Sequence, residues 1–252
     1  MAAPYDQAQA LFDDGRYAEA ARLATIAGDS KGLALAARCW LAAAAYTLDG
    51  AEKSQALAAG EQAARAALAK NPDNIEALLH LVIALGYKSR DRGYIKAHFA
   101  GYGKEAGKLI DRALRLDRDN AWARAVKAGW HAEIVAAAGG LLAKILYGAS
   151  RREADLNFEA AIGADPDNPV FRIEYAKALL RIGGRRATAK ARHELETGLS
   201  LPATGAFEKR ALAEAGELLA AANKGNRRQI VNTVRRLSPF ARIPRSPRKL
   251  SR

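Results

Sequence analysis

The sequence predicts an all-α fold, an α-solenoid of stacked antiparallel helix pairs. Half of the 252 residues are hydrophobic, and alanine dominates this share while aromatic residues make up only 7%. Alanine favours helices and lets them approach closely, and no stretch of useful length alternates as a strand does. A five-residue motif also recurs, as KNPDN (70–74), LDRDN (116–120) and ADPDN (164–168), at offsets of 46 and 48.

Each copy of the motif follows a segment with small and apolar residues at matching positions. These are Gly60, Ala64, Ala67, Leu68 and Pro72; Ala106, Ile110, Ala113, Leu114 and Arg118; and Ala154, Phe158, Ala161, Ile162 and Pro166. Offsets of four, three, one and four place them on one helical face, and the motif then ends the helix. Asp and Asn in the motif can cap the helix that follows. We therefore expect Gly60, Ala106 and Ala154 to occupy equivalent places in a regular row of helix pairs.

The segments after the motifs are also helical in pattern, over 75–87, 121–135 and 169–184. The last of them ends at Gly183-Gly184, as helices commonly do. An earlier unit, 8–28, contains a Gly15-Arg16-Tyr17 turn between two short helices.

These residues resemble the tetratricopeptide repeat (TPR), in which two antiparallel helices pack through small and aromatic positions. The spacing departs from the usual repeat of about 34 residues. Repeats of 46 and 48 residues leave 12 to 14 extra residues, which we place between the two helices of a unit.

A more specific resemblance covers residues 105–222. The segments that carry it are GWHAEIVAAAGGLLAKILYGAS, EADLNFEAAIGADPDN, YAKALLRIGG and LPATGAFEKRALAEAGELLAA. This order of segments is similar to the TPR-like region of the regulator of microtubule dynamics family and its bacterial relatives. The resemblance implies the fold and a binding role for this chain, and we do not extend it to microtubule association. A short, Ala- and Arg-rich chain without a recognisable anchor suggests a bacterial protein.

Stacked helix pairs form a superhelix with a concave inner face, lined by the first helix of each pair. We expect a non-catalytic scaffold that binds a protein segment or another elongated ligand on this face. The predicted groove residues combine aromatic rings with polar groups: Tyr87, Trp122, Trp130, His131, Arg172 and Tyr175. Simple packing is the alternative role for them. Whether the groove is open or filled by the chain itself stays undecided at this point.

The net charge of +13 is concentrated near the end of the sequence. Ten Lys and Arg and no acidic residue lie in 224–252, which leaves +3 for 1–223. We divide the chain into a TPR-like domain (1–224), a basic terminal helix (225–240) that covers an end of the stack, and a disordered basic tail (241–252). The candidates for contact with anionic partners are Arg227, Arg228, Arg235, Arg236, Arg245 and Arg248. An alternative function is therefore binding of nucleic acid or an anionic membrane, through this tail and through residues 86–108.

Residues 86–108 interleave tyrosines and Phe99 with Lys and Arg, and contain five of the 21 glycines. Rings beside cations can stack on bases or hold anions. The competing interpretation is an irregular, partly helical loop whose tyrosines pack on a neighbouring repeat. The stretch GYGKEAG lacks the pattern of a phosphate-binding loop.

No pattern indicates an enzyme, a metal or a cofactor. His131 and Glu133 are two residues apart and point in different directions on a helix. The loop that begins at Asp117 has Trp122 and Ala128 where a calcium loop requires Gly and Glu. One cysteine, Cys39, cannot form a disulfide within the chain and is expected to be buried. The start of the sequence lacks the pattern of a signal peptide, which favours the cytoplasm over a periplasmic companion of a transporter.

Overall fold

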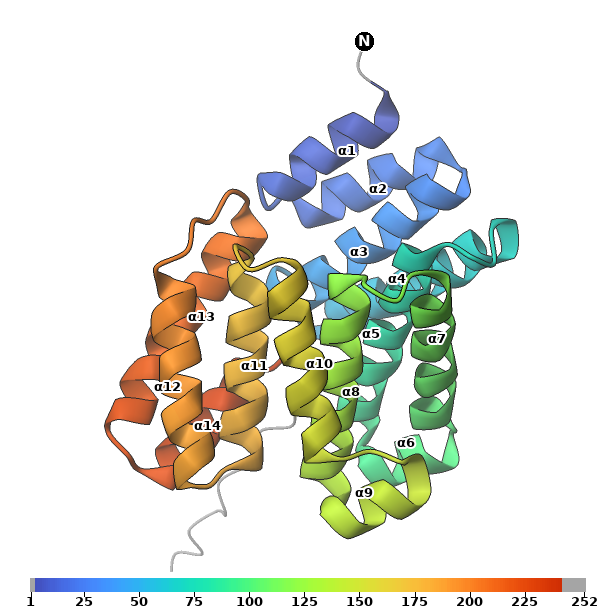
Figure 1. Cartoon of the computed structure of the whole chain (residues 1–252). Coiled ribbons are helices and arrows are strands. Elements are labelled where there is room, and N and C mark those ends of the chain that lie inside the picture. Colours follow the sequence, from blue (N-terminus) through green and yellow to red (C-terminus); the bar gives the residue numbers. More distant parts are fainter. Residues whose placement is uncertain (1–2, 242–252) are drawn as a thin grey trace, which may run out of the picture.

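The structure is a computed structural model that describes residues 3–241. This part of the chain contains 14 α-helices and no strand, so the predicted all-α class is confirmed (Figure 1). Twelve of the helices form six successive pairs. The pairs are α1 (Pro4–Asp13) with α2 (Tyr17–Ala27), α3 (Ser30–Tyr46) with α4 (Gly50–Lys70), α5 (Ile75–Arg92) with α7 (Tyr102–Leu116), α8 (Ala121–Ala138) with α10 (Arg151–Ala164), α11 (Pro169–Ile182) with α12 (Arg185–Leu199), and α13 (Ala206–Asn223) with α14 (Arg227–Arg236).

The three repeated motifs are turns between consecutive pairs. In each, the side-chain oxygen of the last Asn accepts a backbone N–H from the first turn of the next helix. Asn74 accepts from Ala77 at 3.0 Å, and Asn120 accepts from Ala123 at 3.0 Å. Asn168 accepts from Val170 at 3.1 Å. The repetition of the motif therefore reflects the repeated need to end one helix and cap the next.

The small residues before the motifs lie where the second helix of a pair meets the first. A Cβ on Gly60 of α4 would lie 2.9 Å from Leu41 Cγ of α3, so no larger side chain fits without a shift. Ala106 of α7 is buried in a cluster with Leu85 of α5, and Ala154 of α10 is buried in the helix that pairs with α8. The expected equivalence of the three positions is confirmed.

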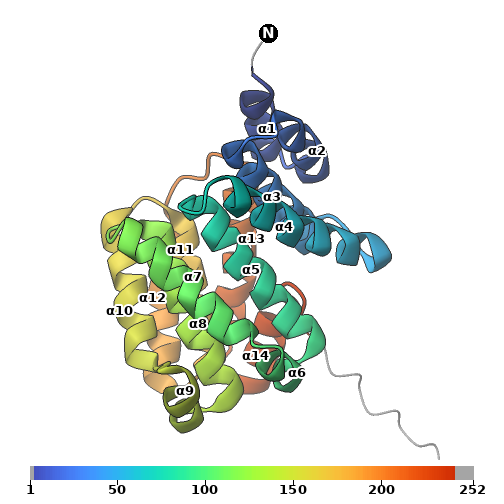
Figure 2. The same ribbon diagram turned by 90° about the vertical axis from the view of Figure 1, so that its right-hand side faces the viewer.

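The extra residues of the long repeats form two short helices. Helix α6 (Tyr94–Phe99) lies between α5 and α7, and α9 (Gly140–Tyr147) lies between α8 and α10. Both project at the end of the molecule opposite α1 and α2 (Figures 1 and 2). The insertions are therefore placed within pairs, as the spacing of the motifs predicts.

The stack curls until its beginning meets its end. Phe207, in the first turn of α13, packs against Phe12 of α1 and Tyr46 of α3, with ring centroids 6.2 Å and 5.8 Å apart. The turn after α1 is also close, since a Cβ on Gly15 would lie 3.0 Å from the Ala206 Cβ. Each first helix of a pair contacts the next one, from α1 to α13, and α13 contacts α1, so we call the side that the first helices line the concave face.

Helix α14 completes the stack. Ile230, Val234 and Leu237 are buried in the largest hydrophobic cluster, together with residues of α11 and α13. The same cluster contains Phe158 and Tyr175, whose stacked rings lie 4.9 Å apart and join α10 to α11. This position agrees with a terminal helix that covers an end of the stack. Residues 242–252, most of the expected disordered tail, lie outside the described residues.

Candidate functional site on the concave face

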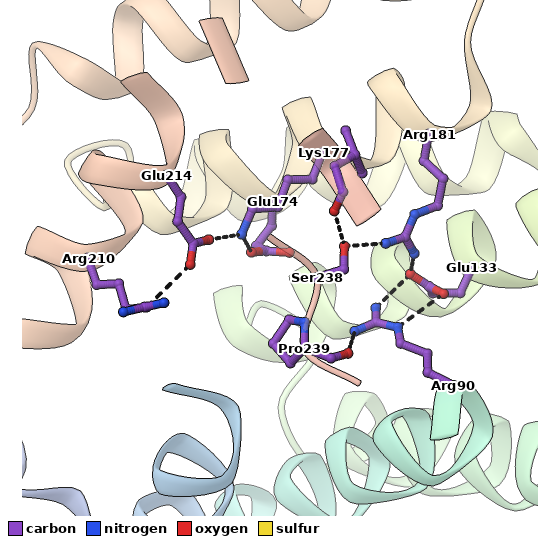
Figure 3. A network of polar contacts seen from close by, with 10 residues as sticks. Arg90, Glu133, Glu174, Lys177, Arg181, Arg210, Glu214, Ser238 and Pro239 are labelled. Carbon is purple, nitrogen blue, oxygen red and sulfur yellow. Dashed lines mark hydrogen bonds and ion pairs between the residues drawn. The ribbon is translucent and has the colours of Figure 1, made fainter. Parts of the chain in front are cut away.

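Charged side chains from four different first helices converge on the concave face (Figure 3). Helix α11 supplies three of them, Glu174, Lys177 and Arg181, at spacings of three and four residues. This spacing places them on one side of a helix that is otherwise strongly apolar. The others come from α5 (Arg90), α8 (Glu133) and α13 (Arg210 and Glu214). They form two clusters.

The first, the Glu133 cluster, gathers Arg90, Tyr94, Glu133 and Arg181. Arg90 Nη2 lies 2.6 Å from Glu133 Oε1, and the Tyr94 hydroxyl donates to Oε2 at 2.9 Å. Arg181 also pairs with Oε1 of this carboxylate. Burial, together with the charge of Arg90, lowers the pKa of Arg181 to about 10, which leaves it protonated at neutral pH. Two guanidinium groups thus share one carboxylate, so the cluster carries an excess of positive charge.

The second, the Lys177 cluster, joins α11 to α13. Lys177 Nζ lies 2.7 Å from both Glu174 Oε1 and Glu214 Oε2. Arg210 Nε approaches the other Glu214 oxygen at 3.4 Å. Burial opposes the charge of Lys177, but the two carboxylates outweigh burial and raise the pKa of the ammonium group. This cluster is internally balanced and fixes the relative position of the two helices.

Aromatic rings also lie on this face. Tyr87 of α5 stacks on Phe240, with centroids 5.0 Å apart and planes 29° from parallel. Lys53 Nζ of α4 lies 4.7 Å from the centroid of the Phe240 ring. The Arg210 guanidinium lies 4.7 Å from the centroid of the Tyr46 ring. Burial raises the pKa of Tyr87 to about 12, so its hydroxyl is neutral at physiological pH.

The occupant of this face is the chain itself. After α14 ends at Arg236 and Leu237 packs in the core, residues 238–241, which we call the return segment, make a turn between the helices (Figure 3). The Ser238 hydroxyl accepts from Arg181 Nη2 at 2.6 Å and donates to the Val234 carbonyl at 2.6 Å. The Pro239 carbonyl accepts from Arg90 Nη1 at 3.3 Å. Residues 238–240 of the chain itself therefore occupy this part of the concave face.

Among the residues predicted to line the groove, Tyr87 lies on the concave face. Trp122 is at the start of α8, half exposed, with its ring edge-on to Phe171 at 4.8 Å. Trp130 lies between α7, α8 and α9, where its indole N–H donates to the Gly103 carbonyl at 3.0 Å.

The other three predicted residues lie between helix layers. His131 is buried, accepts the Ser150 backbone N–H at 3.4 Å, and has its pKa lowered by burial and by the nearby Lys127 charge. Arg172 of α11 pairs with Glu194 of α12 at 2.9 Å. The Tyr175 side chain is only 1% exposed, and its hydroxyl donates to an Asp155 oxygen at 3.0 Å. The structure thus places these residues in helix–helix contacts, and their role toward a partner stays a prediction.

The predicted anionic-partner residues are spread over several environments. Arg227 donates to the backbone carbonyls of Leu180 and Arg181, where it caps the end of α11. Arg236 pairs with Glu217, whereas Arg228 is exposed on α14. Arg235 lies close enough to add to the positive potential at Arg181. Arg245 and Arg248 lie outside the described residues.

Sequence reasoning missed the charged residues of both clusters and the return segment. One signal was available, because charged residues at i, i+3 and i+7 within the apolar helix 169–182 mark a face that does not pack on a hydrophobic core. No comparable signal existed for the contact between Arg90 and Pro239, which are separated by 149 residues.

Comparison with known proteins supports the fold. A scan against protein-family models finds no match, and a search of curated proteins finds no relative. Among solved structures, the chain is similar to a thermophilic TPR protein of Thermus thermophilus, with a TM-score of 0.58 and 20% sequence identity. The match covers 84% of this chain and 96% of that one. The fold is thus that of a TPR-like helical-repeat protein, and the finer resemblance to the regulator of microtubule dynamics family is not confirmed by it.

Proposed function

We propose that this chain is a non-catalytic scaffold that binds a non-helical protein segment on its concave face. One observation carries the proposal: a stretch of non-helical polypeptide is held there, in the chain's own return segment. Arg90 holds a backbone carbonyl of that segment, Arg181 holds a side-chain hydroxyl, and Tyr87 stacks on an aromatic ring. Carbonyl, hydroxyl and ring contacts of this kind are what a scaffold needs to hold a peptide from another protein.

The TPR-like fold agrees with this function, because helical-repeat proteins generally use their concave faces to bind partners. The concave face is supported by the Lys177 cluster, which fixes α11 against α13. The bound segment therefore meets preorganised side chains, which lowers the entropic cost of binding.

A library of random 12-residue peptides, selected on the immobilised full-length chain, tests the proposal. Selected peptides are then titrated against wild type, Tyr87→Ala and Asn232→Ala. We expect Tyr87→Ala to weaken binding at least tenfold, because it removes the ring that stacks on the ligand. Asn232→Ala, on the exposed side of α14, should leave the affinity unchanged. Peptides that bind Tyr87→Ala as tightly as wild type would place the binding surface elsewhere and contradict the proposal.

Attachment to an anionic membrane surface is a second candidate function, favoured by the tip formed by α6 and α9. The two helices contact each other through a hydrogen bond between His98 and Tyr147. Large apolar side chains on them are strongly exposed, including Phe99 at 84%, Ile95 at 78% and Leu141 at 74%. Apolar patches this exposed generally mark an interaction surface.

The charges at this tip favour a lipid surface. Helices α6 and α9 contain one lysine each, Lys96 and Lys144, both exposed, and neither helix contains Asp or Glu. Apolar side chains bordered by cations match the boundary between headgroups and acyl chains of an anionic bilayer. Nucleic acid would use the rings of residues 86–108 for stacking, but Tyr87 and Tyr94 are already engaged within the chain. No helix in the described part of the chain is both long and apolar enough to cross a membrane.

Co-sedimentation with vesicles tests the second function. Vesicles of three parts phosphatidylcholine to one part phosphatidylglycerol are compared with pure phosphatidylcholine. We expect binding to the anionic vesicles, reduced at least tenfold by the double substitution Ile95→Ser and Leu141→Ser. Ile26→Ser is the matched control, since Ile26 is 73% exposed on α2 at the other end of the molecule. Equal binding by the double variant and the control would contradict membrane attachment through this tip.

A further inference from the structure

The return segment has the features of a ligand in its binding site. Different side chains hold each of its groups. Arg181 of α11 binds its hydroxyl, and Arg90 of α5 binds its backbone carbonyl. Tyr87 of α5 and Lys53 of α4 contact its ring. The segment follows α14 directly, and Ser238 is buried. Phe240 packs against the hydrophobic cluster that contains Leu41 and Leu57, as well as against Tyr87.

The backbone of the segment is strained at the residue that makes the ring contact. Phe240 has a φ of 60°, and within residues 3–241 it is the only residue other than glycine with a positive φ. A bulky side chain rarely adopts this region, because its Cβ is crowded by the backbone. Such a conformation persists only where surrounding contacts hold it. Release of the segment removes this strain. While the segment is bound, the contacts with the groove must offset the energy of the strained backbone.

The chemistry of the groove does not match the segment completely. The Glu133 cluster presents two guanidinium groups to one carboxylate, and Arg235 adds to the positive potential. Ser238, which lies in this field, is neutral. A carboxylate at the same place would accept charge-assisted hydrogen bonds from Arg181 and would offset the excess charge. A ligand with an acidic side chain there is better matched than the chain's own serine.

We propose that residues 238–240 are an internal ligand that closes the concave face. The partner they stand in for is a protein segment that makes the same turn, with an acidic side chain at the position of Ser238 and an aromatic ring at the position of Phe240. This inference rests on the proposed peptide-binding function. Covalent attachment gives the internal segment an effective concentration in the millimolar range. A partner must therefore bind the groove more tightly than a free segment with serine at this position would. The additional charge of the acidic group supplies that difference.

The test uses the full-length chain and a fluorescently labelled peptide that copies residues 235–241 with Ser238→Asp. Its binding is measured by fluorescence anisotropy to wild type, Phe240→Ala and Ser238→Lys. Phe240→Ala removes the ring of the internal ligand, and Ser238→Lys places a like charge against the arginines. We expect each variant to bind the peptide at least tenfold more tightly than wild type. Asn232→Ala, exposed on α14, is the control and should behave as wild type.

Two further arms separate the inference from the function on which it rests. Adding Tyr87→Ala to Phe240→Ala should abolish the gain, because the groove itself is then damaged. The unmodified serine peptide should bind Phe240→Ala about five- to tenfold more weakly than the aspartate peptide.

Equal binding of the aspartate peptide to wild type and to both opened variants, Phe240→Ala and Ser238→Lys, would overturn the internal ligand. Selected library peptides whose binding depends on Tyr87 would still support the proposed function in that case. Equal affinity of the serine and aspartate peptides would overturn the acidic partner. Loss of both peptide and library binding would overturn inference and function together.

Discussion

The Lys177 cluster provides a quantitative prediction about the wall of the groove. Lys177→Met removes the ammonium group that contacts both Glu174 and Glu214 at 2.7 Å. Glu174 is half exposed and can turn toward water, whereas the Glu214 side chain is 6% exposed. The cost is therefore set by Glu214, which keeps only the longer contact with Arg210 at 3.4 Å.

Breaking a buried ion pair by removing one partner costs about 3–5 kcal/mol when the remaining charge has no compensation. Because Arg210 compensates Glu214 in part, we expect Lys177→Met to lower the free energy of unfolding by about 2–3 kcal/mol. Glu214→Leu leaves Lys177 paired with Glu174 and should cost about 1–2 kcal/mol. The double variant Lys177→Met, Glu214→Leu should lie within about 1 kcal/mol of wild type, since well-packed apolar groups replace a buried pair at little cost.

Urea denaturation followed by circular dichroism at neutral pH measures these differences. Because Glu174 and Glu214 raise the pKa of Lys177, its contribution is complete below the ordinary lysine value of about 10.4. The contribution is lost only as the pH rises through the folded-state pKa. If the double variant is as unstable as Lys177→Met alone, the cluster does not act as a coupled pair, and the reasoning is refuted.

Two further predictions test the repeat packing and a partly buried histidine. Gly60→Val should lower the free energy of unfolding by about 1–3 kcal/mol, because the valine side chain meets Leu41. Gly86→Ala, which has open space around it, should raise the free energy of unfolding by about 0.5–1 kcal/mol. Equal effects of the two substitutions in thermal melts would contradict the assignment of Gly60 to a helix crossing. His80 donates from Nδ1 to the Glu76 carbonyl, and burial, with the charge of Arg38, lowers the pKa of His80 to about 3. Its stabilising contribution is present above the unfolded value of about 6.5 and is lost as the pH falls toward the folded value. Between pH 6 and pH 5, wild type should lose about 1 kcal/mol more than His80→Gln, and parallel pH profiles would show that His80 is not held neutral.

Much of the fold could be predicted because its signals are local. Asn74, Asn120 and Asn168 cap the helices that follow them, and this chemistry is complete within a few residues. Gly60 likewise indicates a close helix crossing, because it is a residue without a side chain in a helix. The spacing of the motifs also placed the insertions within helix pairs, because the motifs themselves are the turns between pairs.

The site could not be predicted in the same way. Which side of a first helix faces the groove depends on the small rotation between successive pairs, which no local pattern encodes. Trp130 and Tyr175 therefore appeared suitable for a groove, although they pack between helix layers. The return segment depends on contacts with α5 and α11, far away in the sequence, so its position follows only from the complete curl of the stack.

The most direct test of the account is whether Phe240 contacts Tyr87 in solution. A nuclear Overhauser effect between their rings, measured on the full-length chain with labelled Phe and Tyr and assigned with Phe240→Leu, reports this contact. With the centroids 5.0 Å apart, we expect a clear signal that disappears when the aspartate peptide is added. Absence of the signal in the free chain, or its persistence when the peptide saturates the groove, would contradict the account.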